Sequence, residues 1–337
     1  MGCPRRGFVA GLALAATAAG PVPGDPKYVQ DAQQLLQADL MVAKVAYLLQ
    51  TSALGHCPRK TALPAMLVLD ASQYPADWRR FIAAQWGASR HPTVEAVVPG
   101  GPADQAGVKA RDEIVSLNGQ DFEAQLPPLA DKQDSGTRIT AIRDRIDAAF
   151  AAGPVRLGLL RNGQPLGITV TGTPACWSFV EIGQGMGHQA SAEGAVVTID
   201  QGMLAEIQSE ADLAFILGHE LSHNFLKTRE ELDAKGTSFG LFSAFGENGA
   251  RLRDSEREAD YRGVYMLTWA GYDPHSGANF WRRHSRMDVN GLIAMSHPSN
   301  ATRIHDLEAV AAEIEAKRAA GKPLDPDYQH FRSVVGH

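Results

Sequence analysis

The sequence predicts an α+β protein in which a mainly helical domain is interrupted by a smaller β-rich domain. Apolar residues recur at helical spacing in residues 26–54 and again beyond residue 209, whereas residues 93–171 show the alternation and Asn-Gly turns of antiparallel strands. The chain has 337 residues, 44% apolar and 21% charged, which is enough for two folded units. A net charge of −6 without a long basic run gives no electrostatic basis for nucleic-acid binding.

Residues 1–24 have the layout of an export signal. Arg5 and Arg6 precede an apolar stretch, residues 8–19, which ends in small residues, proline and glycine. Because about 20 apolar residues are needed to span a bilayer, we predict a cleaved signal and no transmembrane segment in the mature chain. The two arginines fit either a general or a twin-arginine signal. We therefore expect a soluble or peripheral protein of the periplasm or cell envelope.

Export would leave two cysteines, since Cys3 precedes the apolar stretch and would be removed with the signal. Cys57 and Cys176 are candidates for a disulfide in an oxidising compartment. Two separate buried thiols are the alternative, because pairing cannot be deduced from sequence.

Residues 25–89 are predicted to form the N-terminal helical part of the larger domain. Few breakers interrupt the helical spacing of residues 26–54, so one long helix is expected there. A short strand follows at 65–69 and a second helix at 77–86.

Residues 90–174 are predicted to form the inserted β-rich domain. Strands are expected at 93–98, 112–117, 155–160 and 166–171, with a helix at 139–150. Asn-Gly pairs at 118–119 and 162–163 predict tight turns, the second of them a hairpin.

Four short motifs in this segment resemble the PDZ domains of bacterial envelope proteases: Gly101-Pro102-Ala103, Ala106-Gly107-Val108, Asp112-Glu113-Ile114 and Leu117-Asn118-Gly119. The resemblance covers about 80 residues, a plausible size for a small domain. It implies a domain that binds extended peptides by adding a strand to a sheet edge. An apolar carboxylate-binding loop is not recognisable in residues 77–90, so a purely architectural role is the alternative.

Residues 175–337 are predicted to be mainly helical, with one strand at 195–199. Ser209 is a good N-cap for the first helix, and Asp212 lies in its first turn. Further helices are expected at 254–269, 276–285 and 301–320. The apolar residues 239–245 are too few for a membrane span and are expected to form a loop or short hairpin near the site.

The pentapeptide His-Glu-Leu-Ser-His at 219–223 lies in the first of these helices. A separation of four residues puts His219 and His223 on one face, one turn apart, where a single ion can contact both. Two imidazoles, a carboxylate and an open position suit Zn²⁺, which lowers the pKa of a bound water to about 7. Glu220 is placed to take a proton from the attacking water and deliver it to the leaving amine.

Glu256 and Asp260 lie one turn apart on the next long helix. Glu256 can complete the coordination sphere, and Asp260 can accept the N–H of a ligating imidazole and fix its tautomer. The alternative for Asp260 is an ordinary carboxylate on the helix surface.

Together these residues resemble the gluzincin metallopeptidases of family M48, the group that includes HtpX and the CAAX prenyl endopeptidases. The resemblance covers about residues 180–307 and implies a zincin-type fold with one Zn²⁺ per chain. In the family pattern His219, His223 and Glu256 correspond to the zinc ligands and Glu220 to the general base.

Two further features carry over from the family. Residues 296–299 and 303–304 match its His-Pro and Arg-Ile pairs, which implies that His297 lies near the cleft and helps to stabilise the oxyanion. A surface loop histidine is the alternative for His297. The strand at 195–199 resembles the edge strand along which gluzincins pair an extended substrate.

The predicted function is therefore zinc-dependent hydrolysis of peptide bonds in unfolded or damaged envelope proteins by an exported member of the family. The alternative is a chaperone-like or regulatory peptide-binding protein whose zinc site is occluded. Only turnover that depends on Glu220 separates the two. A structural zinc site is disfavoured because three protein ligands leave one coordination position open.

Overall fold

The computed structural model describes residues 24–88, 90–130, 136–183, 187–234, 236–237, 246–284 and 298–335. The predicted export signal, apart from its last residue, lies outside these residues, as do the predicted loop at 239–245 and His297. Within the described chain, no helix combines the length and the apolar character that crossing a membrane requires.

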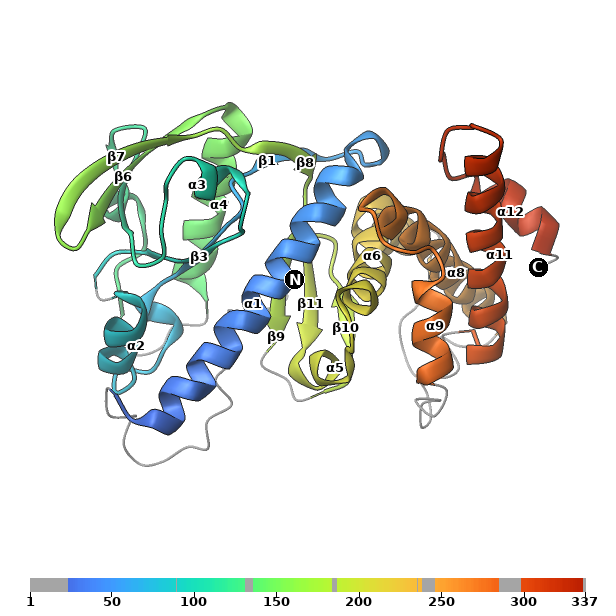
Figure 1. Cartoon of the computed structure of the whole chain (residues 1–337), viewed down its shortest axis with the longest axis horizontal. Helices are drawn as coiled ribbons and strands as arrows, with labels where there is room; N and C mark the ends of the chain where they lie inside the picture. Colours follow the sequence, from blue (N-terminus) through green and yellow to red (C-terminus); the bar gives the residue numbers. More distant parts are fainter. Residues whose placement is uncertain are drawn as a thin grey trace. The chain divides into compact units, whose positions relative to one another are not determined.

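The described residues form two compact units. Unit 1 contains those of 1–47, 60–175 and 181–187, and unit 2 those of 48–59, 176–180 and 188–337. Figure 1 shows the described elements and labels many of those in each unit.

Unit 1 is built on an antiparallel sheet in the order β2-β3-β4-β6-β7, with β5 paired to β4. Its strands are β2 Met66–Leu69, β3 Thr93–Val97, β4 Glu113–Leu117, β5 Gln120–Asp121, β6 Val155–Arg161 and β7 Gln164–Val170. A separate pair joins β1 Lys60–Leu63 to β8 Thr173–Cys176. The α-helices are α1 Pro26–Ser52, whose last residues belong to unit 2, α2 Arg79–Trp86, α3 Pro102–Gln105 and α4 Thr137–Ala152.

Both predicted Asn-Gly turns connect paired strands. Asn118 and Gly119 have φ of 51° and 80°, and Asn162 and Gly163 have φ of 52° and 75°. Positive φ at both central residues matches the twist of a two-residue hairpin. The second turn fixes the register of β6 on β7, from Arg161 opposite Gln164 to Val155 opposite Val170.

The core of unit 1 lies between the sheet and α4. Its fully buried side chains include Ile114, Phe122, Ile142, Phe150 and Leu157. Alternate residues of β6 are buried, as expected for a strand with one face on a core.

Among the described residues of unit 1, the carboxyl groups of Asp70 and Asp112 are buried in ion pairs with Arg138 and Arg161. Asp39 on α1, 9% exposed, and Glu95 on β3, 7% exposed, are also buried. Burial, together with the proximity of Asp39, raises the pKa of Glu95 from 4.5 to about 8. Burial also raises the pKa of Asp39 from 3.8 to about 7. Arg143 opposes both shifts but does not cancel them.

Unit 1 should therefore lose stability as the pH rises. Folded Glu95 holds its proton more tightly than the unfolded chain does, so this contribution is full below about pH 4.5 and is lost as the pH rises through about 8. Thermal melts from pH 5 to 8.5 should show a falling melting temperature, and Glu95→Gln should flatten the slope. Glu247→Gln, at a glutamate that is 95% exposed, should keep the wild-type slope. An unchanged slope in Glu95→Gln would contradict the assignment.

Unit 2 is mainly helical. Its α-helices are α5 Gln201–Glu206, α6 Glu210–Leu226, α7 Thr228–Ala234, α8 Gly246–Trp269, α9 Ser276–Arg283, α11 Asn300–Ala319 and α12 Tyr328–Val335. Ser209 caps α6 as predicted, because its hydroxyl accepts the N–H of Asp212 at 3.2 Å. The helix predicted at 254–269 begins eight residues earlier, at Gly246.

The predicted edge position of residues 195–199 is wrong. The strand exists as β11, Val196–Asp200, but it is the central strand of a sheet in the order β10-β11-β9. β9 is Phe179–Gly183 and β10 is Ala190–Ala192. Gly194, with φ of 80°, turns the chain so that β10 folds back on β11. Among the described residues, β10 is therefore an edge strand of this sheet.

Cys57 and Cys176 are joined by a disulfide, with their Cα atoms 5.8 Å apart. Nearby, the side-chain amide of Gln50 donates to the carbonyls of Cys176 at 3.0 Å and Ser178 at 2.8 Å. The short segment 176–180 is thus held to residues 48–59 by the disulfide, by these two hydrogen bonds and by that from the Trp177 N–H to the carbonyl of Arg59 at 2.9 Å.

Candidate active site

Helices α6 and α8 approach each other closely at the pentapeptide because glycines face each other there. A Cβ atom on Gly263 of α8 would lie 3.0 Å from the backbone nitrogen of His219, and one on Gly218 of α6 would lie 3.2 Å from the carbonyl oxygen of Gly263. Both distances are shorter than an ordinary van der Waals contact. The close approach brings the carboxylates of α8 within reach of the imidazoles of α6.

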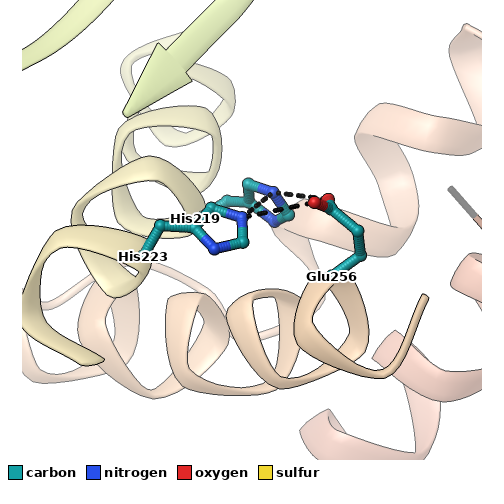
Figure 2. Close-up of side chains that lie close together, drawn as sticks. All are labelled: His219, His223 and Glu256. Carbon is teal, nitrogen blue, oxygen red and sulfur yellow. Dashed lines mark hydrogen bonds and ion pairs between the residues drawn. The ribbon is translucent and has the colours of Figure 1, made fainter. Parts of the chain in front are cut away.

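The side chains of His219, His223 and Glu256 point toward one another (Figure 2). The two Nε2 atoms are 3.3 Å apart, and the carboxylate oxygens of Glu256 lie 3.2 Å from Nε2 of His219 and 3.6 Å from Nε2 of His223. Among the described residues, these three form the one group of histidine, cysteine and acidic side chains arranged to hold a metal ion.

The donor set fits zinc. Two ligand atoms that are each about 2.1 Å from a tetrahedral Zn²⁺ lie about 3.4 Å from each other. The two imidazole nitrogens are 3.3 Å apart, and the distances of 3.2 and 3.6 Å run from them to different oxygens of Glu256; these values bracket about 3.4 Å. Two imidazoles and one carboxylate also leave a tetrahedral ion with an open position.

Asp260 holds the far side of the His219 ring. Its Oδ1 lies 2.8 Å from Nδ1 of His219, which directs the Nε2 lone pair to the shared centre. Arg303 on α11 donates to both oxygens of Asp260, at 2.7 Å from Nε and 2.5 Å from Nη2. The guanidinium carbon of Arg303 also lies 4.1 Å from the ring centre of Trp281 on α9. Four helices therefore contribute to the orientation of one imidazole.

The site stabilises positive charge at its centre. Burial alone would lower the pKa of His219, but hydrogen bonds to Asp260 and Glu256 raise that pKa to about 10. Burial likewise opposes ionisation of Asp260, but the charge of Arg303 and the hydrogen bond from His219 hold its pKa at about 2. A metal ion that binds Nε2 of His219 has to displace the proton held there.

Arg303→Met should weaken zinc binding about 10- to 100-fold, the usual effect of losing a partner that orients a metal-ligating histidine. The reason is that Asp260 loses both guanidinium contacts and no longer fixes the ring of His219. The dissociation constant measured by competition with a chelator tests this. Arg318→Met, at an exposed arginine of the same helix, is the matched control and should bind zinc like wild type. Wild-type affinity in Arg303→Met would contradict the role.

Glu220 is half-buried on α6, directly after His219. His297 lies outside the described residues, so its predicted role stays a prediction. The contacts of Arg303 and Trp281 with the site were not anticipated, since pairs separated by tens of residues have no local signal. Gly218 and Gly263 do carry a weak sequence signal, because a glycine inside a helical pattern often marks a close contact.

An HExxH helix whose two histidines face a glutamate from the next long helix is the arrangement typical of gluzincin-type metallopeptidases. Comparison of the sequence with known protein families agrees with this class. Residues 235–311 match the model of peptidase family M48, and residues 93–132 match that of the PDZ domain. The chain therefore contains an M48 peptidase domain and a PDZ domain, which confirms the predicted fold class.

Individual proteins match parts of the chain. The mitochondrial metalloendopeptidase OMA1 of Schizosaccharomyces pombe is 28% identical over 166 residues, 42% of this chain and 49% of the relative. OMA1 of Arabidopsis thaliana is 24% identical over 145 residues, 38% of this chain and 30% of the relative. The periplasmic pH-dependent serine endoprotease DegQ of Escherichia coli is 38% identical over 78 residues, 23% of this chain and 14% of the relative. The chain thus spans half the length of these relatives or less.

Proposed function

We propose that the chain is a zinc-dependent metalloendopeptidase. The observation that carries the proposal is the convergence of Nε2 of His219, Nε2 of His223 and the Glu256 carboxylate at separations that suit Zn²⁺. The M48 match and the likeness to OMA1 metalloendopeptidases support the same reaction.

Each residue of the site has a distinct part in the proposed reaction. His219, His223 and Glu256 would hold one zinc ion, and Asp260 would keep His219 in the tautomer that binds it. When bound, zinc supplies Lewis acidity that polarises the scissile carbonyl and acidifies a water molecule. Glu220 accepts the proton as that water attacks, and returns it to the leaving amine nitrogen. His297 would donate a hydrogen bond to the oxyanion.

The proposed substrate is an unfolded or damaged protein, bound as an extended strand. Because β10 is an edge strand of its sheet and packs against α6, the helix that carries His219 and His223, we assign the main-chain pairing to Ala190–Ala192 in place of β11. The PDZ domain supplies a second surface suited to extended peptides.

We further propose that the protein is exported and acts in the cell envelope. The charged and apolar pattern of residues 1–24 supports export. The likeness to the periplasmic protease DegQ and the Cys57–Cys176 disulfide fit an oxidising compartment.

Purified protein with one bound zinc per chain should cleave unfolded casein. Removing the metal with a chelator should abolish cleavage, and adding back one equivalent of zinc should restore it, because the ion activates the water. Zinc content and product formation are measured on the same samples. Failure of the zinc-loaded protein to cleave several unfolded substrates would favour the chaperone-like alternative.

A further inference from the structure

We propose that Asn224 is a positioning residue that fixes the substrate-pairing strand β10 relative to the metal ligands. Asn224 directly follows His223 on α6 and is only 7% exposed. Its Oδ1 accepts the backbone N–H of Gly194 at 2.8 Å, and its Nδ2 donates to Oγ of Ser178 at 2.9 Å. The inference rests on the proposed function, in which β10 binds the substrate.

Gly194 lies at the turn of the β10–β11 hairpin. The N–H of Glu193 donates to the carbonyl of Val196 at 2.9 Å, which closes the turn, and Gly194 adopts φ of 80°. The Gly194 N–H therefore points out of the hairpin, where Asn224 receives it. This contact ties the tip of the hairpin to α6, against which β10 also packs.

Ser178 anchors the other end of the Asn224 side chain. Its carbonyl accepts from Gln50, and Cys176, two residues earlier, is held by the disulfide to Cys57. The Ser178 hydroxyl also lies 3.3 Å from the carbonyl of Ala195, the residue after the turn glycine. Asn224 thus bridges a fixed segment and the hairpin turn, so both of its hydrogen bonds resist displacement of β10.

Asn224 is adjacent to His223 in the sequence, so its hydrogen bonds link the hairpin to a proposed metal ligand. Successive residues of an α-helix project about 100° apart, so one short piece of backbone carries both the metal ligand His223 and the hairpin contact. A hairpin held less firmly on α6 would present a less ordered pairing edge, so a strand-paired substrate would bind more weakly beside the metal ligands. Asn224 touches neither substrate nor metal, and it acts through β10.

Asn224→Leu removes both hydrogen bonds at similar volume. The expected result is at least about tenfold faster hydrogen exchange at the Gly194 amide, as expected when its buried acceptor is lost. With a ten-residue peptide as substrate, KM should rise about tenfold while kcat stays within about twofold, because substrate positioning is weakened and the general base is untouched. Zinc content should remain one per chain.

Asn224→Asp is the conservative control, because a carboxylate can accept both the Gly194 N–H and the Ser178 hydroxyl proton. In Asn224→Asp, the exchange rate of the Gly194 amide and the KM for the peptide should stay within about threefold of wild type. If Asn224→Leu fails to fold, Ser178→Ala, which removes one anchor of the bridge, should still accelerate Gly194 exchange. The Leu159 amide, in the β6–β7 ladder of unit 1, is the internal standard and should not change.

Wild-type exchange at Gly194 in Asn224→Leu would overturn the inference, and so would a fall in kcat at unchanged KM or a loss of zinc. Failure of the proposed function is recognised separately, because wild-type protein would then cleave no peptide. Hydrogen exchange would still decide in that case whether Asn224 fixes the hairpin.

Discussion

Replacing Glu220 with glutamine should lower kcat for an unfolded substrate about a thousand- to ten-thousand-fold, the upper range for loss of a general base. Glutamine has nearly the same shape, but its amide cannot take a proton from the attacking water. The three converging ligand atoms belong to other residues, so zinc should remain bound at one per chain. Steady-state cleavage of casein and metal analysis of the same preparation measure both quantities.

Glu258→Gln provides the matched control. Glu258 lies on α8 between Glu256 and Asp260, but its carboxylate pairs with Arg262 at 2.9 Å and is absent from the metal group. Its kcat should stay within about twofold of wild type, as for most surface changes away from a site. Retention of more than about a tenth of the activity in Glu220→Gln would remove Glu220 from the role of general base.

The candidate metal ligands could be identified from the sequence because local geometry pairs them. His219 and His223 lie one helical turn apart, and so do Glu256 and Asp260, whatever the rest of the fold does. Only the meeting of the two helices is non-local, and the resemblance to a known family supplied it. The observed contact between Asp260 and His219 has the geometry that this reasoning proposed for it.

The order of strands in a sheet is harder to predict from the sequence than the position of each strand along the chain. The alternation in residues 195–199 located β11, but alternation does not say which neighbours a strand has. The short segment Ala190–Ala192 carries no strong β signal, so the sequence does not predict the hairpin that places β10 at an edge of the sheet. The informative residue was Gly194, whose positive φ allows the turn.

Buried polar contacts were the least predictable. Arg303 and Asp260 are separated by 43 positions, and Asn224 and Ser178 by 46. Such pairs form because a buried charge or amide needs a partner, and the partner is chosen by packing. The sequence could identify Arg303 as part of a family motif, but not that it binds the carboxylate behind a metal ligand.

The second large effect should come from the Cys57–Cys176 disulfide. The cross-link closes a segment of 119 residues, which contains most of unit 1. Closing so long a loop restricts the unfolded chain strongly, so Cys57→Ser with Cys176→Ser should lower the free energy of unfolding by about 2–5 kcal/mol. Urea denaturation of the double variant, compared with wild type in the presence and absence of reductant, measures this loss.

The position of the disulfide makes its effect specific to unit 2. The chain leaves unit 2 after residue 59 and returns at Cys176, so the bond joins the exit and re-entry points within that unit. Reduced wild type should match the double variant, because both leave segment 176–180 without a covalent link to residues 48–59. The loss should extend to the hairpin through Ser178 and Asn224, so Gly194 exchange should accelerate on reduction. Stability that does not change with reductant would show that the bond is absent in solution or that packing alone holds this segment.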